Sequence, residues 1–213
     1  MDVISSLHGG LRKLTFTRKD LNNRTTILRR ELLGVDMSTT IEYFQQIQAK
    51  NPSFFYVVQV DDNNTVKNIF WVDGKSRMAY QHFGDVITFD TTYMTNKYSM
   101  PFAPIIGVSH QSILFGCALI RDEKVKSFIW VFRTWLEAMF DRHPISILTD
   151  QDPAMKEAIK IVFPKITHRF CQWHIMKKAR DHLGVLYNVK EGFAKELKSC
   201  INQSLTVEEF ETR

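Results

Sequence analysis

Two short apolar runs that each end in an aspartate constrain the fold of this sequence more than any other feature. The first is VITFD at residues 86–90, and the second is ISILTD at residues 145–150. Each run is rich in β-branched or large apolar side chains and has the length of a strand, so each predicts a buried β-strand. Asp90 and Asp150 would then stand at the carboxyl ends of two strands.

The segment between these runs predicts two further strands and a helix. Strands are expected at residues 102–108 and 112–120, joined by a tight turn at His110-Gln111, so that three consecutive strands form a meander. Apolar residues between positions 125 and 140 recur at the spacing of one helical face, which predicts a helix packed against the sheet. These residues are Phe128, Phe132, Trp135, Leu136 and Met139.

The part after the second run predicts a helix, a strand and a basic helix. Asp152 suits an N-cap and Pro153 the first helical position, so a helix is expected from there to Pro164. Residues 166–170 predict a fifth strand, and the basic helix that follows is expected to stop at Gly184. Strands and helices in this order are typical of an α/β fold, a mixed sheet flanked by helices.

The residues before position 84 predict a helix and a hairpin. Thr39 followed by Glu42 has the pattern of a capping box and predicts a helix that ends at Asn51. Two β-rich runs separated by Asn63-Asn64 predict a β-hairpin. We therefore expect four parts: a peripheral basic arm over 1–35, a helix and hairpin subdomain over 36–83, the α/β core over 84–184, and the start of a helical region over 185–213.

Composition narrows the class of protein. The 213 residues are 44% hydrophobic and 24% charged, which is ordinary for a globular chain. No apolar run reaches the roughly 18 residues that a membrane-spanning helix needs, and the amino end lacks a signal-peptide pattern, so we expect a soluble protein that is not exported. Three widely spaced cysteines argue for a reducing compartment, and the net charge of +5 is compatible with nucleic-acid binding without requiring it.

The two aspartates suggest a metal site if their strands are neighbours. In adjacent parallel strands, Asp90 and Asp150 would emerge at one edge of the sheet, where two carboxylates are most stable with a cation between them. Mg²⁺ or Mn²⁺ suits such oxygen ligands, and the associated chemistry is phosphodiester cleavage or strand transfer. The alternative is that each aspartate is a turn residue or a helix cap, as we expect for Asp85 and Asp152.

Cys171 and His174 form a second candidate pair for metal binding. They lie three residues apart at a predicted helix start, so they face one side and can supply two ligands to Zn²⁺. Two ligands leave a tetrahedral site incomplete. The alternative is a buried cysteine and a hydrogen-bonded histidine that join the last strand to its helix.

Basic and aromatic side chains supply candidates for nucleic-acid binding. A basic cluster on the last strand and helix of the core can contact phosphates, and two tyrosines in the polar loop after Asp90 can stack on bases. The alternative for the basic cluster is a solvated face. The candidates are Arg169, Lys177, Lys178, Arg180, Tyr93 and Tyr98.

Several long runs of the sequence resemble one known family. The transposase-derived core of the plant far-red-impaired-response related proteins, domesticated relatives of Mutator-like element (MULE) transposases, is similar to the runs FGDVITFDTTYMTNKYSMPFAPIIGV, SFIWVFRTWLEAM, TDQDPAM and HRFCQWHIMKKA. The resemblance covers nearly the whole chain from about residue 36. It implies an RNase H-like fold, with Asp90 and Asp150 at the first two positions of a DDE-type acidic triad and Cys171 and His174 on a C-x-x-H motif.

The resemblance also implies a function. Members of the family act mainly as nuclear DNA-binding transcription regulators in light signalling, and full-length members carry additional zinc-binding domains. We assign no residue to the third acidic position, so we expect a catalytically inactive regulator. Its expected partners are DNA, other transcription regulators and family members in homo- or heterodimers, with no membrane partner. The alternative is an active Mutator-like transposase core that performs metal-dependent DNA cleavage and strand transfer.

Overall fold

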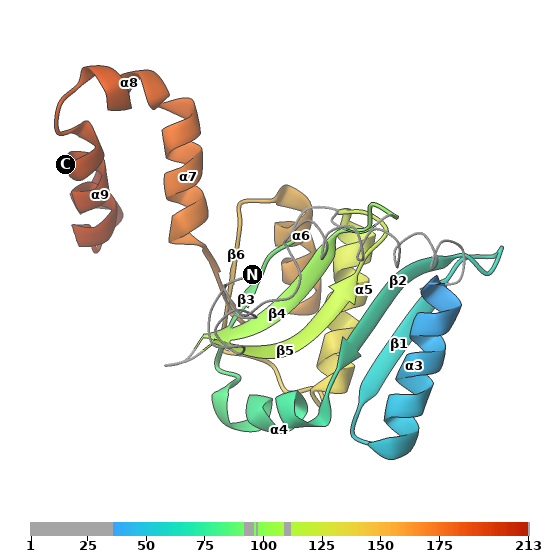
Figure 1. Ribbon diagram of the computed structural model, residues 1–213. Helices are drawn as coiled ribbons and strands as arrows, with labels where there is room; N and C mark the ends of the chain where they lie inside the picture. The colour runs from blue at the N-terminus through green and yellow to red at the C-terminus, as the bar shows by residue number, and fades with distance from the viewer. Residues whose placement is uncertain (1–35, 92–95, 97, 109–111, 213) are drawn as a thin grey trace, which may run out of the picture. The chain divides into compact units, whose positions relative to one another are not determined.

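The computed structural model describes residues 36–91, 96, 98–108 and 112–212 (Figure 1). The chain divides into two units, Met1–Lys50 and Asn51–Arg213. In the first unit the structure describes helix α3 (Asp36–Lys50). The capping box expected at Thr39 is wrong, because the three residues before it already have helical backbone and Thr39 lies inside the helix. The peripheral arm over 1–35 lies outside the described residues.

The second unit is built on a seven-stranded mixed sheet. Its strands follow one another across the sheet in the order β1-β2-β5-β4-β3-β6-β7. β3 pairs with β6 and β6 with β7 in parallel, and the other four neighbouring pairs are antiparallel. The bounds are β1 Phe55–Val60, β2 Val66–Val72, β3 Val86–Phe89, β4 Phe102–Val108, β5 Ser112–Leu119, β6 Ser146–Thr149 and β7 Thr167–Phe170. The predicted mixed α/β class is confirmed.

Helices precede, connect and follow these strands. Figure 1 shows α5 and α6 together on one face of the sheet. None of the helices in the described part of the chain is both long and apolar enough to cross a membrane. The bounds are α4 Gly74–Phe83, α5 Val125–Ala138, α6 Pro153–Val162, α7 Gln172–His182, α8 Gly184–Val189, α9 Phe193–Gln203 and α10 Val207–Thr212.

The predicted hairpin forms and extends the core sheet. Asn64 takes a left-handed backbone conformation (φ 58°), and the Asp61 N–H donates to the Thr65 carbonyl at 2.9 Å, which closes the turn between β1 and β2. β2 then pairs with β5, with Phe70 opposite Ala118. The domain boundary expected at residue 84 therefore does not coincide with a break in the sheet.

Helix α4 was not predicted. It begins where the Asp73 carboxylate accepts a hydrogen bond from the Ser76 N–H at 2.8 Å. Within the helix only Gly74 and Tyr80 are buried, so the sequence lacks the apolar periodicity that indicates a helix. Tyr80 is fully buried and its hydroxyl donates to the Arg142 carbonyl at 2.9 Å, which attaches α4 to the loop before β6.

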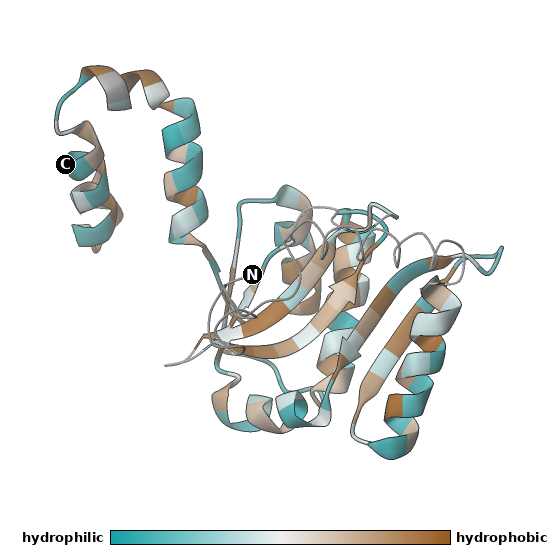
Figure 2. Cartoon of the chain, in the orientation of Figure 1, coloured by the Kyte–Doolittle hydropathy of each residue, from teal (hydrophilic) through white to brown (hydrophobic). Residues whose placement is uncertain are grey.

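The core lies between the sheet and α5, where aromatic rings meet edge to face. The predicted apolar face of α5 is buried throughout, which confirms that helix and its orientation. The ring centroid of Phe132 lies 4.8 Å from that of Phe89 on β3 and 5.3 Å from that of Phe163. Figure 2 shows hydrophobic residues concentrated along the strands and hydrophilic residues along α7.

A β-bulge in β5 ties the sheet to α5. Ile105 pairs with Gly116 and Ile106 with Leu114, so Phe115 is the extra residue. The indole Nε1 of Trp135 donates to the Phe115 carbonyl at 3.2 Å. Gly116 has φ +146°, and a Cβ there would lie 2.7 Å from the Phe70 ring, so the bulge requires glycine at this position.

Replacing Phe132 with alanine should remove the centre of this aromatic cluster. Because the ring is fully buried among rigid neighbours, we expect Phe132→Ala to lower the free energy of unfolding by about 3–5 kcal/mol in urea denaturation. The control is Arg133→Ala, an exposed position on the same helix, which should change it by less than about 0.5 kcal/mol. Equal effects of the two substitutions would contradict this view of the core.

Candidate functional site

Parallel pairing of two strands brings Asp90 and Asp150 to one edge of the sheet. β3 and β6 are adjacent, with Val86 opposite Ser146 and Thr88 opposite Leu148. Continued by two residues, this register sets Asp90 opposite Asp150. The adjacency on which the predicted metal site depended is therefore present.

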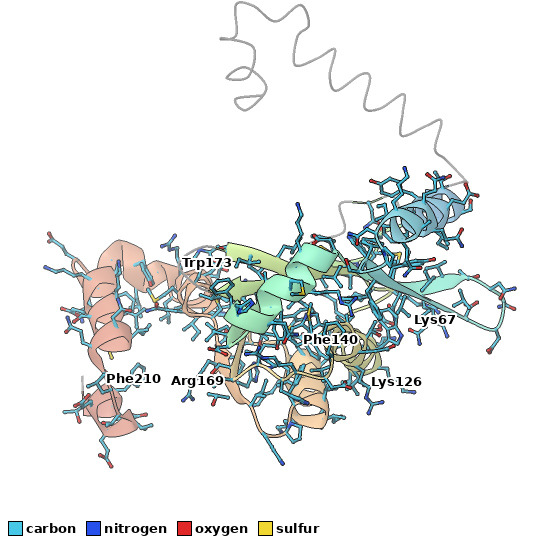
Figure 3. The ribbon with its side chains drawn as sticks, turned by 90° about the horizontal axis from the view of Figure 1, so that it is seen from below. Lys67, Lys126, Phe140, Arg169, Trp173 and Phe210 are labelled. Carbon is cyan, nitrogen blue, oxygen red and sulfur yellow. The ribbon has the colours of Figure 1, made fainter. Side chains whose placement is uncertain are left out.

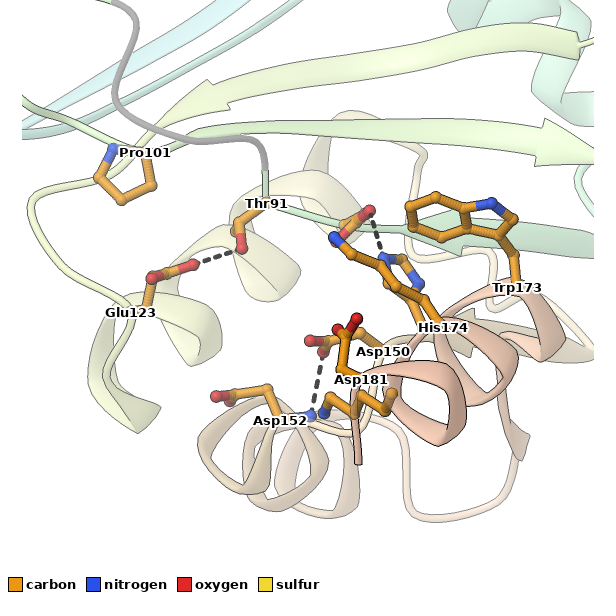
Figure 4. Close-up of a pocket in the computed structure, with 11 residues that line it drawn as sticks. Thr91, Pro101, Glu123, Asp150, Asp152, Trp173, His174 and Asp181 are labelled. Atoms are coloured by element: carbon orange, nitrogen blue, oxygen red, sulfur yellow. Dashed lines mark hydrogen bonds and ion pairs between the residues drawn. The ribbon is translucent and has the colours of Figure 1, made fainter. Parts of the chain in front are cut away.

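The two aspartates line a cleft of about 530 Å³ (Figure 4). One side of the cleft comes from the strand ends and from the loop between β5 and α5, which contributes Glu123. The other side comes from α7, whose lining residues are Trp173, His174, Lys177, Lys178 and Asp181. The cleft thus contains the carboxylates of the sheet edge, two lysines and one carboxylate from α7, and one carboxylate from the β5–α5 loop.

Asp90 has a specific partner in the cleft. The His174 Nε2 lies 3.4 Å from a carboxylate oxygen of Asp90, a contact that the dashed line at His174 marks in Figure 4. Burial raises the pKa of the Asp90 carboxyl above its usual value, the His174 imidazole opposes that rise, and the Asp150 carboxylate adds to it. Asp150 therefore lies close enough to Asp90 to disfavour its ionised form.

The other ring nitrogen of His174 is isolated. Nδ1 is buried and has no hydrogen-bond partner among the described residues. This arrangement fits a ring that carries its proton on Nε2 and donates it toward Asp90. His174 therefore acts in this structure as a partner of Asp90.

Asp150 and Asp152 have different local roles. An Asp150 oxygen accepts the Asp152 N–H at 3.0 Å. The Asp152 carboxylate accepts the Met155 N–H at 2.7 Å, and Pro153 occupies the first position of α6. The predicted capping role of Asp152 is confirmed, although Asp152 also lines the cleft. Asp85 lies before β3, where its carbonyl accepts the N–H groups of Ile145 and Ser146.

Two acids of the cleft were missed in the sequence. Glu123 lies in the β5–α5 loop and accepts a hydrogen bond from the Thr91 hydroxyl. Asp181 lies on α7 seven residues after His174, and the two side chains share a helical face with Lys177 and Lys178. That spacing was the available signal for Asp181. Glu123 has no comparable signal, since its place depends on how the loop leaves β5.

The remaining candidates lie outside this cleft or outside the described residues. Cys171 is partly buried at the N-cap of α7, and Arg169 and Arg180 are exposed and do not line the cleft. Tyr98 is 44% exposed. Tyr93 and the expected turn at His110-Gln111 lie outside the described residues.

Two different sets of side chains near Asp90 are candidates for holding a cation. Among the residues that the structure describes, no three side chains of His, Cys, Asp and Glu are placed together to hold a metal ion. Asp90 and Asp150 offer two carboxylates whose repulsion Mg²⁺ or Mn²⁺ would relieve, with water filling the other coordination positions. The His174 Nε2 faces Asp90, so a Zn²⁺ ion shared with Cys171 would use Nδ1, which has no hydrogen-bond partner among the described residues. Both metal sites stay predictions.

The raised pKa of Asp90 predicts a pH-dependent effect of its replacement. Because the folded state binds this proton more tightly than the unfolded state, the free energy of unfolding falls as the pH rises from 3.8 through the folded pKa. Ionised Asp90 thus lowers stability at neutral pH. We expect Asp90→Asn to raise Tm at pH 7 by about 1–2 °C in metal-free buffer and to leave Tm unchanged below the unfolded pKa.

Thermal unfolding from pH 3 to pH 7 followed by circular dichroism measures this difference. The shift is small because the side chain is 43% exposed and solvent screens its charge. The control is Asp62→Asn, an exposed carboxylate in the β1–β2 turn. A Tm for Asp90→Asn that falls below the unmodified protein's at pH 7 would mean that pairing with His174 outweighs burial.

Comparison with known proteins supports the assignment of these residues to one domain. Residues 86–178 match the family model of the MULE transposase domain. Among curated proteins of Arabidopsis thaliana, FAR1-RELATED SEQUENCE 5 is 43% identical over 99% of this chain and 27% of its own length. FAR1-RELATED SEQUENCE 7 is 39% identical over 99% of this chain and 28% of its own length. FAR-RED IMPAIRED RESPONSE 1 is 39% identical over 84% of this chain and 22% of its own length.

The chain thus spans about a quarter of the length of the curated relatives that it matches. The family match covers the strands that carry Asp90 and Asp150 and continues into α7, so it includes most of the cleft. The chain belongs to the far-red-impaired-response related family and carries a MULE transposase domain over residues 86–178.

Proposed function

We propose that this chain is the transposase-derived core of a nuclear transcription regulator that controls light-responsive genes without cleaving DNA. Its similarity to FAR-RED IMPAIRED RESPONSE 1 and to FAR1-related proteins supports the family role. The partners of such a regulator are DNA, other transcription regulators and family members with which it forms dimers.

We also propose that the core has the RNase H-like fold. The support comes from five consecutive positions in the sheet, β5-β4-β3-β6-β7. The first three form an antiparallel meander, and β6 and β7 continue in parallel with β3. In that fold the first two acids follow the first and fourth strands, which here are β3 and β6.

The contact between Asp90 and His174 is the observation that supports the regulatory proposal. A site that cleaves phosphodiesters with two metal ions needs enough carboxylate oxygen to hold both. Asp90 is instead paired with His174, and Lys177 and Lys178 bring positive charge into the same cleft. Asp90 and Asp150 are then remnants of a catalytic pair, able to hold one divalent cation weakly.

DNA cleavage and strand transfer form the second candidate function. One observation favours it: Glu123, Asp152 and Asp181 line the same cleft as Asp90 and Asp150. Any of these three carboxylates could supply the oxygen that a second ion requires if the side chains around it rearranged. The two functions differ in whether the acids are needed for activity.

Two kinds of metal cofactor would be held by two different sets of side chains. Mg²⁺ or Mn²⁺ would be held by Asp90 and Asp150, where it would lower the repulsion between the carboxylates and offer open positions to phosphate oxygens. Zn²⁺ would be held in the full-length protein, with Cys171 and His174 as candidate ligands in this chain. Without a divalent cation, His174 is the group that contacts the Asp90 carboxylate.

A shared cation predicts a stabilisation that depends on both acids. We expect saturating Mg²⁺ or Mn²⁺ to raise Tm by about 2–5 °C, because a ligand that binds only the folded state stabilises it by mass action. Asp90→Asn and Asp150→Asn should each abolish most of this shift in differential scanning fluorimetry. The control is Asp62→Asn, an exposed carboxylate in the β1–β2 turn outside the cleft. An undiminished shift in Asp90→Asn would exclude a shared site.

The regulatory proposal predicts that the acids are dispensable for gene control. In plant cells, the full-length protein with both Asp90→Asn and Asp150→Asn should activate a light-responsive reporter at least about half as well as the unmodified protein. The same purified proteins, with Mg²⁺ or Mn²⁺, should leave supercoiled plasmid intact. Nicking that requires Asp90 and Asp150, together with loss of reporter activity in the variant, would instead support the transposase.

A further inference from the structure

A second cleft, of about 860 Å³, lies beside the acidic one and has a basic lining. Its cations come from two separate segments: Lys67 from β2, and Arg121, Lys124 and Lys126 from the β5–α5 loop and the start of α5 that follows it. Figure 3 labels Lys67 and Lys126 on the same side of the molecule. Glu123 lines both clefts, so the two adjoin at the β5–α5 loop.

Three of these cations are available to a ligand. In the part of the chain that the structure describes, no hydrogen bond or ion pair joins the side chains of Lys67, Arg121 or Lys126 to another residue. The positive charges of Lys67 and Arg121 help to lower the pKa of Asp61 in the β1–β2 turn without a direct contact. The two acids that line the cleft have partners within the protein. Asp122 accepts a hydrogen bond from the Ser127 hydroxyl at 2.7 Å and forms an ion pair with Lys124 at 3.6 Å, and Glu123 accepts a hydrogen bond from the Thr91 hydroxyl.

The backbone of the cleft is held rigidly by buried polar contacts. Asn68 is 3% exposed. Its side-chain oxygen Oδ1 accepts a hydrogen bond from the backbone N–H of Arg121 at 2.9 Å, and its side-chain Nδ2 donates one to the Gln59 side chain at 2.6 Å. These bonds fix the loop that carries Arg121 against β2. The cations are therefore presented on a preformed surface, which lowers the entropy cost of binding.

The start of α5 adds to the positive potential. Lys124 is the N-cap residue, it makes no side-chain capping bond, and the first turn contains no acid. The unpaired N–H groups of that turn carry partial positive charge at the same end of the helix as Lys124 and Lys126. This feature reinforces the three free cations and would not make a site without them.

We propose that this basic cleft binds the phosphate backbone of a nucleic acid and leads it past Glu123 toward Asp90 and Asp150. Nucleic acid carries a charge at every nucleotide, which matches the cations that two separate segments place along this cleft. An acidic peptide would meet five carboxylates in the neighbouring cleft, whereas phosphates can share a divalent cation with Asp90 and Asp150. The inference rests on the proposed function, in which DNA is a partner.

Salt-dependent DNA binding by the full chain tests this proposal. The probe is a fluorescein-labelled duplex of about 30 base pairs, and the readout is anisotropy at several salt concentrations. Replacing Lys67, Arg121 and Lys126 together by alanine should weaken binding at least about tenfold at about 100 mM salt. The slope of log K against log salt should become shallower by about 2 to 3, because each lost phosphate contact contributes about 0.9.

The matched control removes three exposed lysines from elsewhere, Lys75, Lys195 and Lys198. It should change affinity by less than about twofold and leave the slope nearly unchanged, since the effect of net charge alone is spread over the surface. Lys126→Glu alone serves if the triple variant does not fold, and it should weaken binding more than Lys75→Glu does. Equal losses in variant and control would overturn the proposal.

A competition arm separates nucleic acid from acidic protein. Poly-glutamate of matched charge should displace the duplex poorly. Displacement as effective as that by unlabelled duplex, and equally sensitive to the triple variant, would make an acidic protein the ligand and overturn the proposal. If the reporter experiment fails but the cleft variants weaken DNA binding as expected, only the proposed regulatory role is contradicted. If the cleft variants do not weaken DNA binding, only the basic-cleft proposal is contradicted, because regulation can act through protein partners.

Discussion

The parallel pairing of β3 with β6 is the constraint on which the site depends. Its register sets Asp90 opposite Asp150, and a shift of one residue would turn one of the two side chains to the other face of the sheet. The pairing is held from one side by α5, whose Phe132 ring contacts Phe89 on β3. Packing in the core thus fixes the distance between two charges at the edge.

Much of this arrangement could be predicted from residues alone. The apolar runs gave the five strands of the core, and the buried face of α5 was visible as a helical spacing that included Phe132 and Trp135. Asp152 and Pro153 identified the start of α6 by capping chemistry. These signals are local: each depends on a few neighbouring residues and on the periodicity of strand or helix.

Other features depend on contacts between distant segments and left little trace in the sequence. Helix α4 buries only Gly74 and Tyr80, so its sequence has no stripe of apolar residues that would indicate a helix. The hairpin was expected in a separate subdomain because nothing local indicates that Phe70 pairs with Ala118. Glu123 reaches the cleft only because of the path of a loop. Pairing between Asp90 and His174 likewise required the position of α7 relative to β3.

The composition of the cleft wall has a further consequence. Of its eleven lining residues, five come from the single helix α7, and these include both lysines and the histidine. Both lysines that line this cleft therefore belong to one helix. Displacing that helix by a few ångströms would leave Asp90, Glu123, Asp150 and Asp152 as an uncompensated anionic surface. The local electrostatic potential at this edge of the sheet thus depends on the position of one helix.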